Sequence, residues 1–170
     1  MEKIKLLKLP ISLKVLCTCY ILTILLGYAV SLVQIFDRTH FDMVETVTYY
    51  RGGDTGEEEE LFVPQSFKTM LSVAHVHTLS QPMMFALIGL IFVFSSAAER
   101  AKVFFIVLLF AGSIASNATP WLVRYIGPGM VYLFPLSQFT ITIGLAAASL
   151  VSLDEMWFKQ RRMAKWINQK

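Results

Sequence analysis

Two histidines, His75 and His77, stand two residues apart near the start of a long apolar run. Imidazole nitrogens bind metal ions and haem iron, and they also exchange protons near neutral pH. Polar side chains are costly in the hydrocarbon of a membrane, so those that occur there usually mark a site or a packing need. The histidine pair is therefore the first candidate for chemistry in this chain.

Other polar side chains interrupt the apolar runs, and a membrane topology places them on the same side as the histidines: Gln34, Gln81, Asn117, Arg124 and Gln138. Arg124 is suited to pairing with an anionic group, such as a haem propionate or a loop carboxylate. We predict a cofactor site that comprises His75, His77, Arg124, Gln81 and Asn117.

The spacing of the histidines limits what they can bind. In a helix, residues i and i+2 point about 200° apart, so His75 and His77 would not grip one haem from both faces or chelate one metal ion. One would then ligate a cofactor while the other faces a neighbour, a second site or the partner in a homodimer. In an extended segment both imidazoles share a face, and His40, Asp42 or a loop glutamate becomes a third metal ligand. Ser66, a predicted N-cap, favours the helix.

Composition sets the class of protein that must position these residues. The 170 residues are 55% hydrophobic and only 16% charged, which leaves too little polar material to cover a soluble globule. Since about 20 apolar residues in a helix cross a bilayer core, we predict an all-α membrane protein with four transmembrane helices packed as a bundle. The predicted spans are approximately 13–36, 69–96, 103–124 and 129–153.

Charge predicts how the chain is oriented. Lysine and arginine gather in 3–14, 100–102 and 159–170, and such residues favour the cytoplasmic side. The first connection, 37–68, holds eight acidic and three basic side chains, a net charge of −5, and is predicted to be an acidic outer loop. We expect a multi-pass protein of the bacterial inner membrane, with both termini cytoplasmic and the histidine site near the outer face. The net charge of +3 averages two opposite faces, so it indicates contact with membrane lipids and not with nucleic acid.

Prolines fall in the outer or central parts of three predicted helices, at Pro82, Pro120 and Pro135. Bends at these positions would open a small cavity on the outer side, although prolines are also common in membrane helices without such a role. Small residues one turn apart, Gly112 with Ser116 and Gly144 with Ala148, predict close approach between neighbouring helices.

Two segments outside the spans have patterns of their own. Residues 44–50 are rich in β-prone side chains and fit either a hairpin with 57–63 or a folded cap. The tail 154–170 mixes aromatic and basic residues, as expected of a basic amphipathic helix on the headgroups or of a surface for a soluble partner.

The chain resembles uncharacterised bacterial four-helix integral membrane proteins with a YYRG loop and an HxH helix. The residues that carry this resemblance are Tyr49-Tyr50-Arg51-Gly52, Phe62, Pro64, Ser66, Phe67, His75-Val76-His77, Trp121-Leu122-Val123-Arg124-Tyr125 and Glu155-Met156-Trp157. It also has a looser likeness to small membrane b-type cytochromes, which implies haem b held between histidines. The sequence departs from that pattern because the first, third and fourth predicted helices contain no histidine.

Several chemistries find no support in the sequence. The predicted spans contain no carboxylate for an ion or proton pathway, and the chain has no phosphate-binding loop, no Cys-x-x-Cys motif and no convincing serine nucleophile. A stand-alone hydrolase or pump is therefore not expected.

Three interpretations of the histidine region remain open. The leading one is a haem b or quinone redox site that acts in electron transfer, with a quinone or a redox protein as partner. A non-haem metal site at His75 and His77 is the second. In the third, the histidines only bond to Gln81, Asn117 or backbone, Arg124 is an interface anchor, and the protein is a non-catalytic subunit or assembly factor of a larger complex. A homodimer or hetero-complex would supply the second ligand that haem requires.

Overall fold

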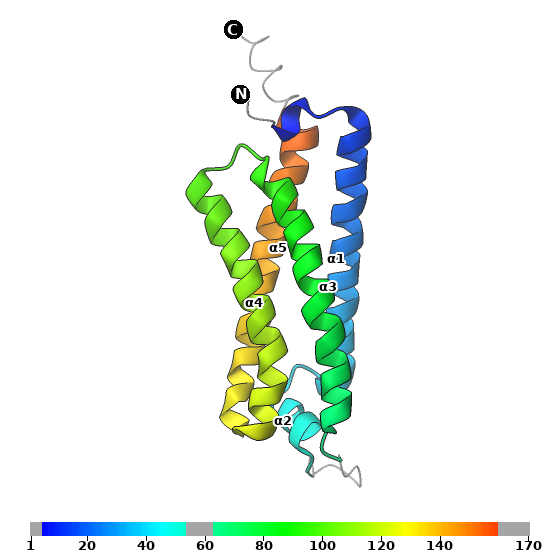
Figure 1. Ribbon diagram of the computed structural model, residues 1–170, viewed down its shortest axis with the longest axis vertical. Coiled ribbons are helices and arrows are strands. Elements are labelled where there is room, and N and C mark those ends of the chain that lie inside the picture. The colour runs from blue at the N-terminus through cyan, green and yellow to red at the C-terminus, as the bar shows by residue number, and fades with distance from the viewer. Residues whose placement is uncertain (1–4, 54–62, 160–170) are drawn as a thin grey trace.

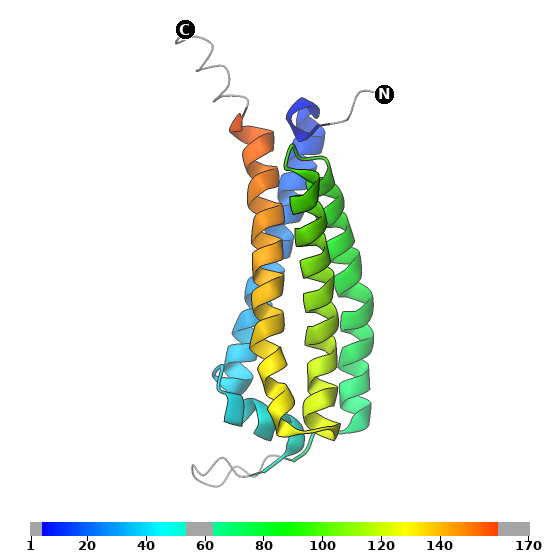
Figure 2. The same ribbon diagram turned by 90° about the vertical axis from the view of Figure 1, so that its left-hand side faces the viewer.

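The computed structural model describes residues 5–53 and 63–159, and they form a bundle of long helices (Figures 1 and 2). The long helices are α1 (Ile11–Thr39), α3 (Phe67–Val93), α4 (Glu99–Tyr125) and α5 (Leu133–Trp157). The shorter elements are η1 (Leu6–Lys8), α2 (Met43–Arg51) and η2 (Pro128–Tyr132). Four helical segments are long and apolar enough to cross a membrane, which confirms the predicted all-α, four-span architecture.

The two ends of the bundle differ in what covers them. Helix α1 begins and helix α5 ends at one end, which we call the terminal end (Figure 1). Helix α2 lies across the opposite end, which we call the loop end (Figure 1). The predicted spans match the helices with shifted bounds: α1 runs to Thr39 and not to 36, and α5 continues to Trp157. The predicted tail helix beyond residue 159 lies outside the described residues.

Side-chain caps start α2 and α3. The hydroxyl of Ser66 accepts a hydrogen bond from the Thr69 amide at 3.1 Å, which confirms the predicted N-cap. The Asp42 carboxylate accepts from the amides of Val44 (2.7 Å) and Glu45 (3.0 Å). The hairpin prediction was therefore wrong for 44–50, because this cap starts a helix despite the β-prone side chains. Most of its proposed partner strand, 57–63, lies outside the described residues.

Glycines allow α4 and α5 to approach closely, as the small-residue spacing predicted. A Cβ added at Gly144 would lie 2.7 Å from Leu109 Cγ, and one added at Gly112 would lie 2.8 Å from Ile141 Cγ1. Real side-chain carbons do not approach this closely, so larger residues at either glycine would push the two helices apart.

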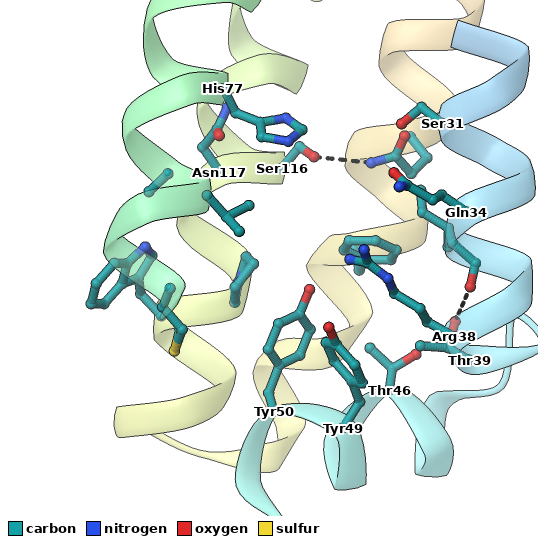
Figure 3. Close-up of a pocket in the computed structure, with 18 of the residues that line it drawn as sticks. Ser31, Gln34, Arg38, Thr39, Thr46, Tyr49, Tyr50, His77, Ser116 and Asn117 are labelled. Atoms are coloured by element: carbon teal, nitrogen blue, oxygen red, sulfur yellow. Dashed lines mark hydrogen bonds between the residues drawn. The ribbon is translucent and has the colours of Figure 1, made fainter. Parts of the chain in front are cut away.

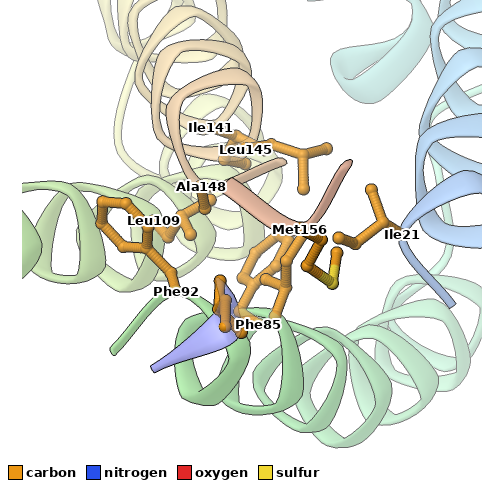
Figure 4. Close-up of a cluster of buried hydrophobic side chains, with 10 residues drawn as sticks. Ile21, Phe85, Phe92, Leu109, Ile141, Leu145, Ala148 and Met156 are labelled. Carbon is orange, nitrogen blue, oxygen red and sulfur yellow. The ribbon is translucent and has the colours of Figure 1, made fainter. Parts of the chain in front are cut away.

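The apolar core lies toward the terminal end. Phe92 on α3, Leu109 on α4 and Leu145 on α5 are buried together, and Leu6 of η1 joins the same cluster (Figure 4). The Leu6 amide also donates to the Phe94 carbonyl at 3.1 Å, which anchors η1 to the end of α3. In a bilayer such burial exchanges lipid contacts for protein contacts, so dense packing stabilises the cluster more than water exclusion does.

Charged side chains at the terminal end bond to backbone. Glu155, only 3% exposed, accepts from the amide of Ser96 at 2.6 Å and from its hydroxyl at 2.7 Å. Lys102 donates to the Val93 carbonyl at 2.8 Å. These bonds tie the α3–α4 connection to α5 and to the start of α4, so this end of the bundle is closed.

Candidate functional site

A pocket of about 180 Å³ lies in the loop-end half of the bundle, between α1, α2, α3, α4 and α5 (Figure 3). An apolar cavity of about 150 Å³ can hold benzene, so this volume suits a group the size of one ring. Pro120 forms part of the wall, and the pocket lies at the end where a cavity was predicted. Polar side chains of the wall include Tyr28, Ser31, Gln34, Arg38, Tyr49, Tyr50, His77, Gln81, Asn117 and Gln138.

The structure brings together some of the residues predicted from sequence and separates others. His77, Gln81 and Asn117 line the pocket, whereas His75 does not; both histidines are exposed. Arg124 also lies outside the pocket, with its guanidinium carbon 5.6 Å from the centre of the Tyr125 ring. Its buried Nε has no hydrogen-bond partner among the described residues.

Helix α3 is continuous from Phe67 to Val93, so His75 and His77 do not form an extended chelating segment. The additional ligands considered for such a segment are engaged elsewhere: Asp42 caps α2, and His40 Nδ1 lies 2.7 Å from Glu45 Oε2. Within 5–53 and 63–159, no three histidine, cysteine, aspartate or glutamate side chains gather as a metal site.

Polar residues of α3 and α4 form one hydrogen-bonded cluster at the pocket wall. Gln81 Oε1 accepts from the Ser113 hydroxyl and from Asn117 Nδ2, both at 2.8 Å. Asn117 Nδ2 also lies 2.8 Å from the Ser113 carbonyl oxygen. Gln81 Nε2 lies 3.2 Å from His77 Nδ1, so the histidine ring is held by the same cluster.

A second cluster ties α1 to α5 and α5 to α4. The Tyr28 hydroxyl lies 2.7 Å from Thr142 Oγ1 and donates to the Gln138 carbonyl at 3.1 Å. Gln138 Nε2 in turn donates to the Ser116 hydroxyl at 2.9 Å (Figure 3). This cluster fixes the position of α1 beside the pocket.

The wall nearest the loop end has a different character. Arg38 carries the only permanent charge among the described residues of the wall, and none of them is a carboxylate. Its guanidinium carbon lies 5.9 Å from the centre of the Tyr49 ring, and no ion pair joins it to any described residue. Figure 3 shows Arg38 and Tyr50 directed into the cavity. This wall therefore offers hydrogen-bond donors that the described part of the protein does not use.

Burial raises the pKa of Tyr50 to about 12, with Tyr49 adding to the rise and Arg38 opposing it. The Tyr50 hydroxyl therefore keeps its proton at any physiological pH and can donate to a bound acceptor.

Contacts of α2 with α4 position the two tyrosines. Arg51, at the end of α2, donates from Nη1 to the carbonyls of Val123 (2.9 Å) and Arg124 (3.4 Å). These carbonyls belong to the last turn of α4, which has no intrahelical donors for them, so the arginine acts as a C-terminal cap. The bond holds the end of α2 against the bundle and directs Tyr50 inward.

Sequence reasoning missed Arg38 and gave Tyr49 and Tyr50 no role. The missed signal is on α1, where Ser31, Gln34 and Arg38 recur at helical spacing on one face. A predicted span that stopped at 36 placed Arg38 in the loop, so this polar stripe was incomplete.

Comparison with known proteins identifies a family. A family model described as a transmembrane helical domain matches residues 40–163. The match begins just after α1 and covers α2 to α5, so three of the four spans and most of the pocket wall lie within it. No curated protein and no solved structure matches the chain.

Proposed function

The chain belongs to this family of transmembrane helical domains and is a multi-pass membrane protein, and we propose that it binds the ring of a quinone in the loop-end pocket as part of membrane electron transfer. The proposed function is still redox chemistry in the histidine region. The residues that would bind the quinone are His77, Arg38 and the α2 tyrosines. A quinone carries two carbonyl oxygens on opposite edges of a flat ring, and both only accept hydrogen bonds.

The distribution of donors around the pocket carries the proposal. Arg38 and Tyr50 approach from the loop end, whereas His77 lies ten residues into α3, roughly 15 Å along the helix axis from its first turn. Donors thus face the cavity from two sides, with no carboxylate among the described wall residues to repel a carbonyl oxygen. A compact phosphate would instead need donors gathered around one point. Trp121 and Phe134 add flat apolar surface for a ring.

Haem b ligated by His75 and His77 stays a prediction. The geometry supports the quinone form of the redox function better, because only His77 lines the pocket and the volume suits one ring rather than a macrocycle. A haem with two histidine ligands would need the second one from another chain, as a homodimer or hetero-complex would provide.

A lipid-soluble ligand would reach this pocket from the bilayer along α1. Among its 29 residues, only Lys14, Ile21 and Thr39 are buried, so α1 is held to the bundle less extensively than α5. Loose packing of this helix favours lateral passage of a flat ring between α1 and its neighbours.

Fluorescence of Trp121 would test the proposal directly. In a Trp157→Phe, Trp166→Phe background, Trp121 is the remaining tryptophan and lines the pocket. Decylubiquinone added to the protein in neutral lipid nanodiscs should quench it saturably, since a quinone stacked in the pocket lies beside the indole. Arg38→Gln should weaken the apparent affinity at least tenfold, because it removes a charge-assisted hydrogen bond.

The matched control is Arg100→Gln, which removes an exposed arginine at the terminal end. It should leave the affinity unchanged. Linear quenching that is equal in all variants would mean simple partition into lipid and would contradict the proposal. If phosphatidylglycerol included in the nanodisc bilayer abolishes the saturable quenching by decylubiquinone, the pocket would be reassigned to an anionic lipid headgroup. Absence of any ligand effect would favour the interpretation as a non-catalytic subunit or assembly factor.

We also propose that the loop end faces the outside of a bacterial inner membrane, with the terminal end cytoplasmic. Val63 is exposed beside the loop end, so a cysteine placed there in a Cys17→Ser, Cys19→Ser background is a suitable probe. An impermeant maleimide should label it in intact spheroplasts. Labelling only after lysis would reverse the topology and place the pocket near the cytoplasm.

A further inference from the structure

The hydrogen bonds around His77 determine which of its two ring nitrogens carries the proton. The starting point is the Ser113 backbone carbonyl, which can only accept a hydrogen bond. Its oxygen lies 2.8 Å from the side-chain amide of Asn117, so the atom of Asn117 that faces it must be the nitrogen Nδ2.

The same nitrogen fixes the orientation of the next amide. Asn117 Nδ2 lies 2.8 Å from Gln81, and the Ser113 hydroxyl, which donates, lies 2.8 Å from the same Gln81 atom. An atom that receives two donors must be the carbonyl oxygen, Oε1. The amide nitrogen Nε2 of Gln81 is therefore the atom turned toward His77.

An amide nitrogen can donate but cannot accept, so His77 Nδ1, 3.2 Å away, must present its lone pair to Gln81. In the neutral ring the proton is then on Nε2, the nitrogen on the far edge of the imidazole. Figure 3 shows the ring of His77 extending into the cavity. The cluster thus holds an N–H donor toward the ligand space.

We infer that His77 is a hydrogen-bond donor to an acceptor oxygen of the pocket ligand, and that Gln81 is the positioning residue that sets its tautomer. This inference rests on the proposed function for the identity of the ligand, a quinone carbonyl, but the tautomer itself does not depend on any ligand. The pocket then selects for ligands whose inner edge accepts a hydrogen bond.

This role differs from the ligand role expected from sequence. A histidine binds metal or haem iron through a nitrogen with a free lone pair. In the present arrangement the nitrogen that faces the cavity carries a proton, and the one with the lone pair is engaged by Gln81. Metal ligation through Nε2 of His77 would require the proton to move to Nδ1, which would break the hydrogen bond from Gln81 Nε2.

The nitrogen chemical shifts of His77 test the inference in the wild-type protein. Protonated and unprotonated ring nitrogens differ widely in ¹⁵N shift, and labelled His77 is identified by its loss in His77→Asn. The inference expects a neutral ring with the proton on Nε2. A proton on Nδ1, an equal mixture of tautomers or a doubly protonated ring at pH 7 would overturn it.

Gln81→Glu should reverse the tautomer. A carboxylate only accepts, so it can still receive the Ser113 hydroxyl and the Asn117 amide, but it draws the His77 proton to Nδ1. The Nε2 lone pair then faces the cavity. Gln34→Glu is the matched control, because it places a carboxylate on the pocket wall across from this cluster and should leave the His77 tautomer unchanged.

Binding separates the two proposals. If His77 donates to the ligand, Gln81→Glu should weaken decylubiquinone at least tenfold relative to wild type, since it sets a lone pair against a carbonyl oxygen. A wild-type ring protonated on Nε2 together with no saturable quinone binding would sink the quinone proposal and leave the tautomer standing. Saturable quinone binding by a wild-type protein whose His77 proton is on Nδ1 would overturn the tautomer and leave the quinone proposal standing. Unchanged quinone affinity in Gln81→Glu, with the His77 proton moved to Nδ1, would contradict donation by His77.

Discussion

The two halves of the bundle differ in how their charged side chains are bonded. In the terminal half, Glu155 and Lys102 are buried and bonded to backbone beside a dense cluster of apolar side chains. In the loop half, Arg38 and Tyr50 face a cavity, and no hydrogen bond joins either side chain to the described part of the chain. Buried polar groups are costly unless they are bonded. The bonded charges of the terminal half stabilise the fold, whereas Arg38 in the loop half is exposed and its donors are not used by the described part of the chain.

This difference indicates that substitutions in the two halves should have separable consequences. Changes in the terminal half should lower the free energy of unfolding, and changes at the loop end should alter binding with little effect on stability.

Gly144→Val should destabilise the protein most. Its branched side chain would collide with Leu109, because even a single Cβ would lie 2.7 Å from Leu109 Cγ. Overpacking of this kind costs typically about 3 kcal/mol at its upper range. The free energy of unfolding in mixed micelles measures it. Gly27→Val is the matched control, since nothing lies within 4 Å of its added Cβ, and equal loss in both variants would contradict close α4–α5 packing.

Glu155→Ala should have the next largest effect. It removes the buried acceptor of the Ser96 amide and hydroxyl and the ion-pair partner of Lys159, at a cost of about 2 kcal/mol. The same unfolding measurement applies. Glu99→Ala removes a carboxylate that is 79% exposed and should change stability by less than about 0.5 kcal/mol. A loss from Glu155→Ala no larger than this would show that the buried carboxylate is not what closes the terminal end.

Arg38→Gln should change stability by less than about 0.5 kcal/mol, because it removes a charge that no described carboxylate pairs with. The same variant should lose quinone affinity, so unfolding and Trp121 quenching are measured on one preparation. A large loss of stability would instead identify Arg38 as a structural residue and would end the contrast between the two halves.

The smallest effect concerns pH at the junction of α1 and α2. The hydrogen bond and charge of Glu45 raise the pKa of His40 above its ordinary value of 6.5, with a smaller contribution from Asp37. A raised pKa means that protonated His40 stabilises the junction fully below pH 6.5, and that this contribution is lost as the pH rises through the raised value. An NMR titration of His40 should show the shift. Glu45→Gln should abolish most of it and Asp37→Asn much less; equal effects would contradict the Glu45 assignment.

The sequence was sufficient to predict the four spans and the small residues at which neighbouring helices approach, because both depend on local composition; which helices pair there is shown only by the structure. Apolar runs near 20 residues long determine where a helix can cross, and Gly112 and Gly144 mark where two backbones can approach. Ser66 was predictable for the same reason, since an N-cap acts within its own first turn.

The pocket was harder to predict because it depends on contacts between distant segments. Residues 44–50 have side chains typical of strands, yet the Asp42 cap and the bond from Arg51 to the end of α4 keep them helical. Arg38 enters the pocket only because α1 extends to Thr39, beyond the apolar stretch that defined the predicted span. His77 was found by its polarity in an apolar run, but its partner His75 faces elsewhere.

The bonds from Tyr28 to Thr142 and to the Gln138 carbonyl join the first long helix to the last. During synthesis, α1 enters the membrane first, and these bonds can form only after α5 has been inserted. A chain that has lost α5 therefore lacks these bonds and one wall of the pocket. The pocket is thus completed only when the last helix has been inserted beside the first.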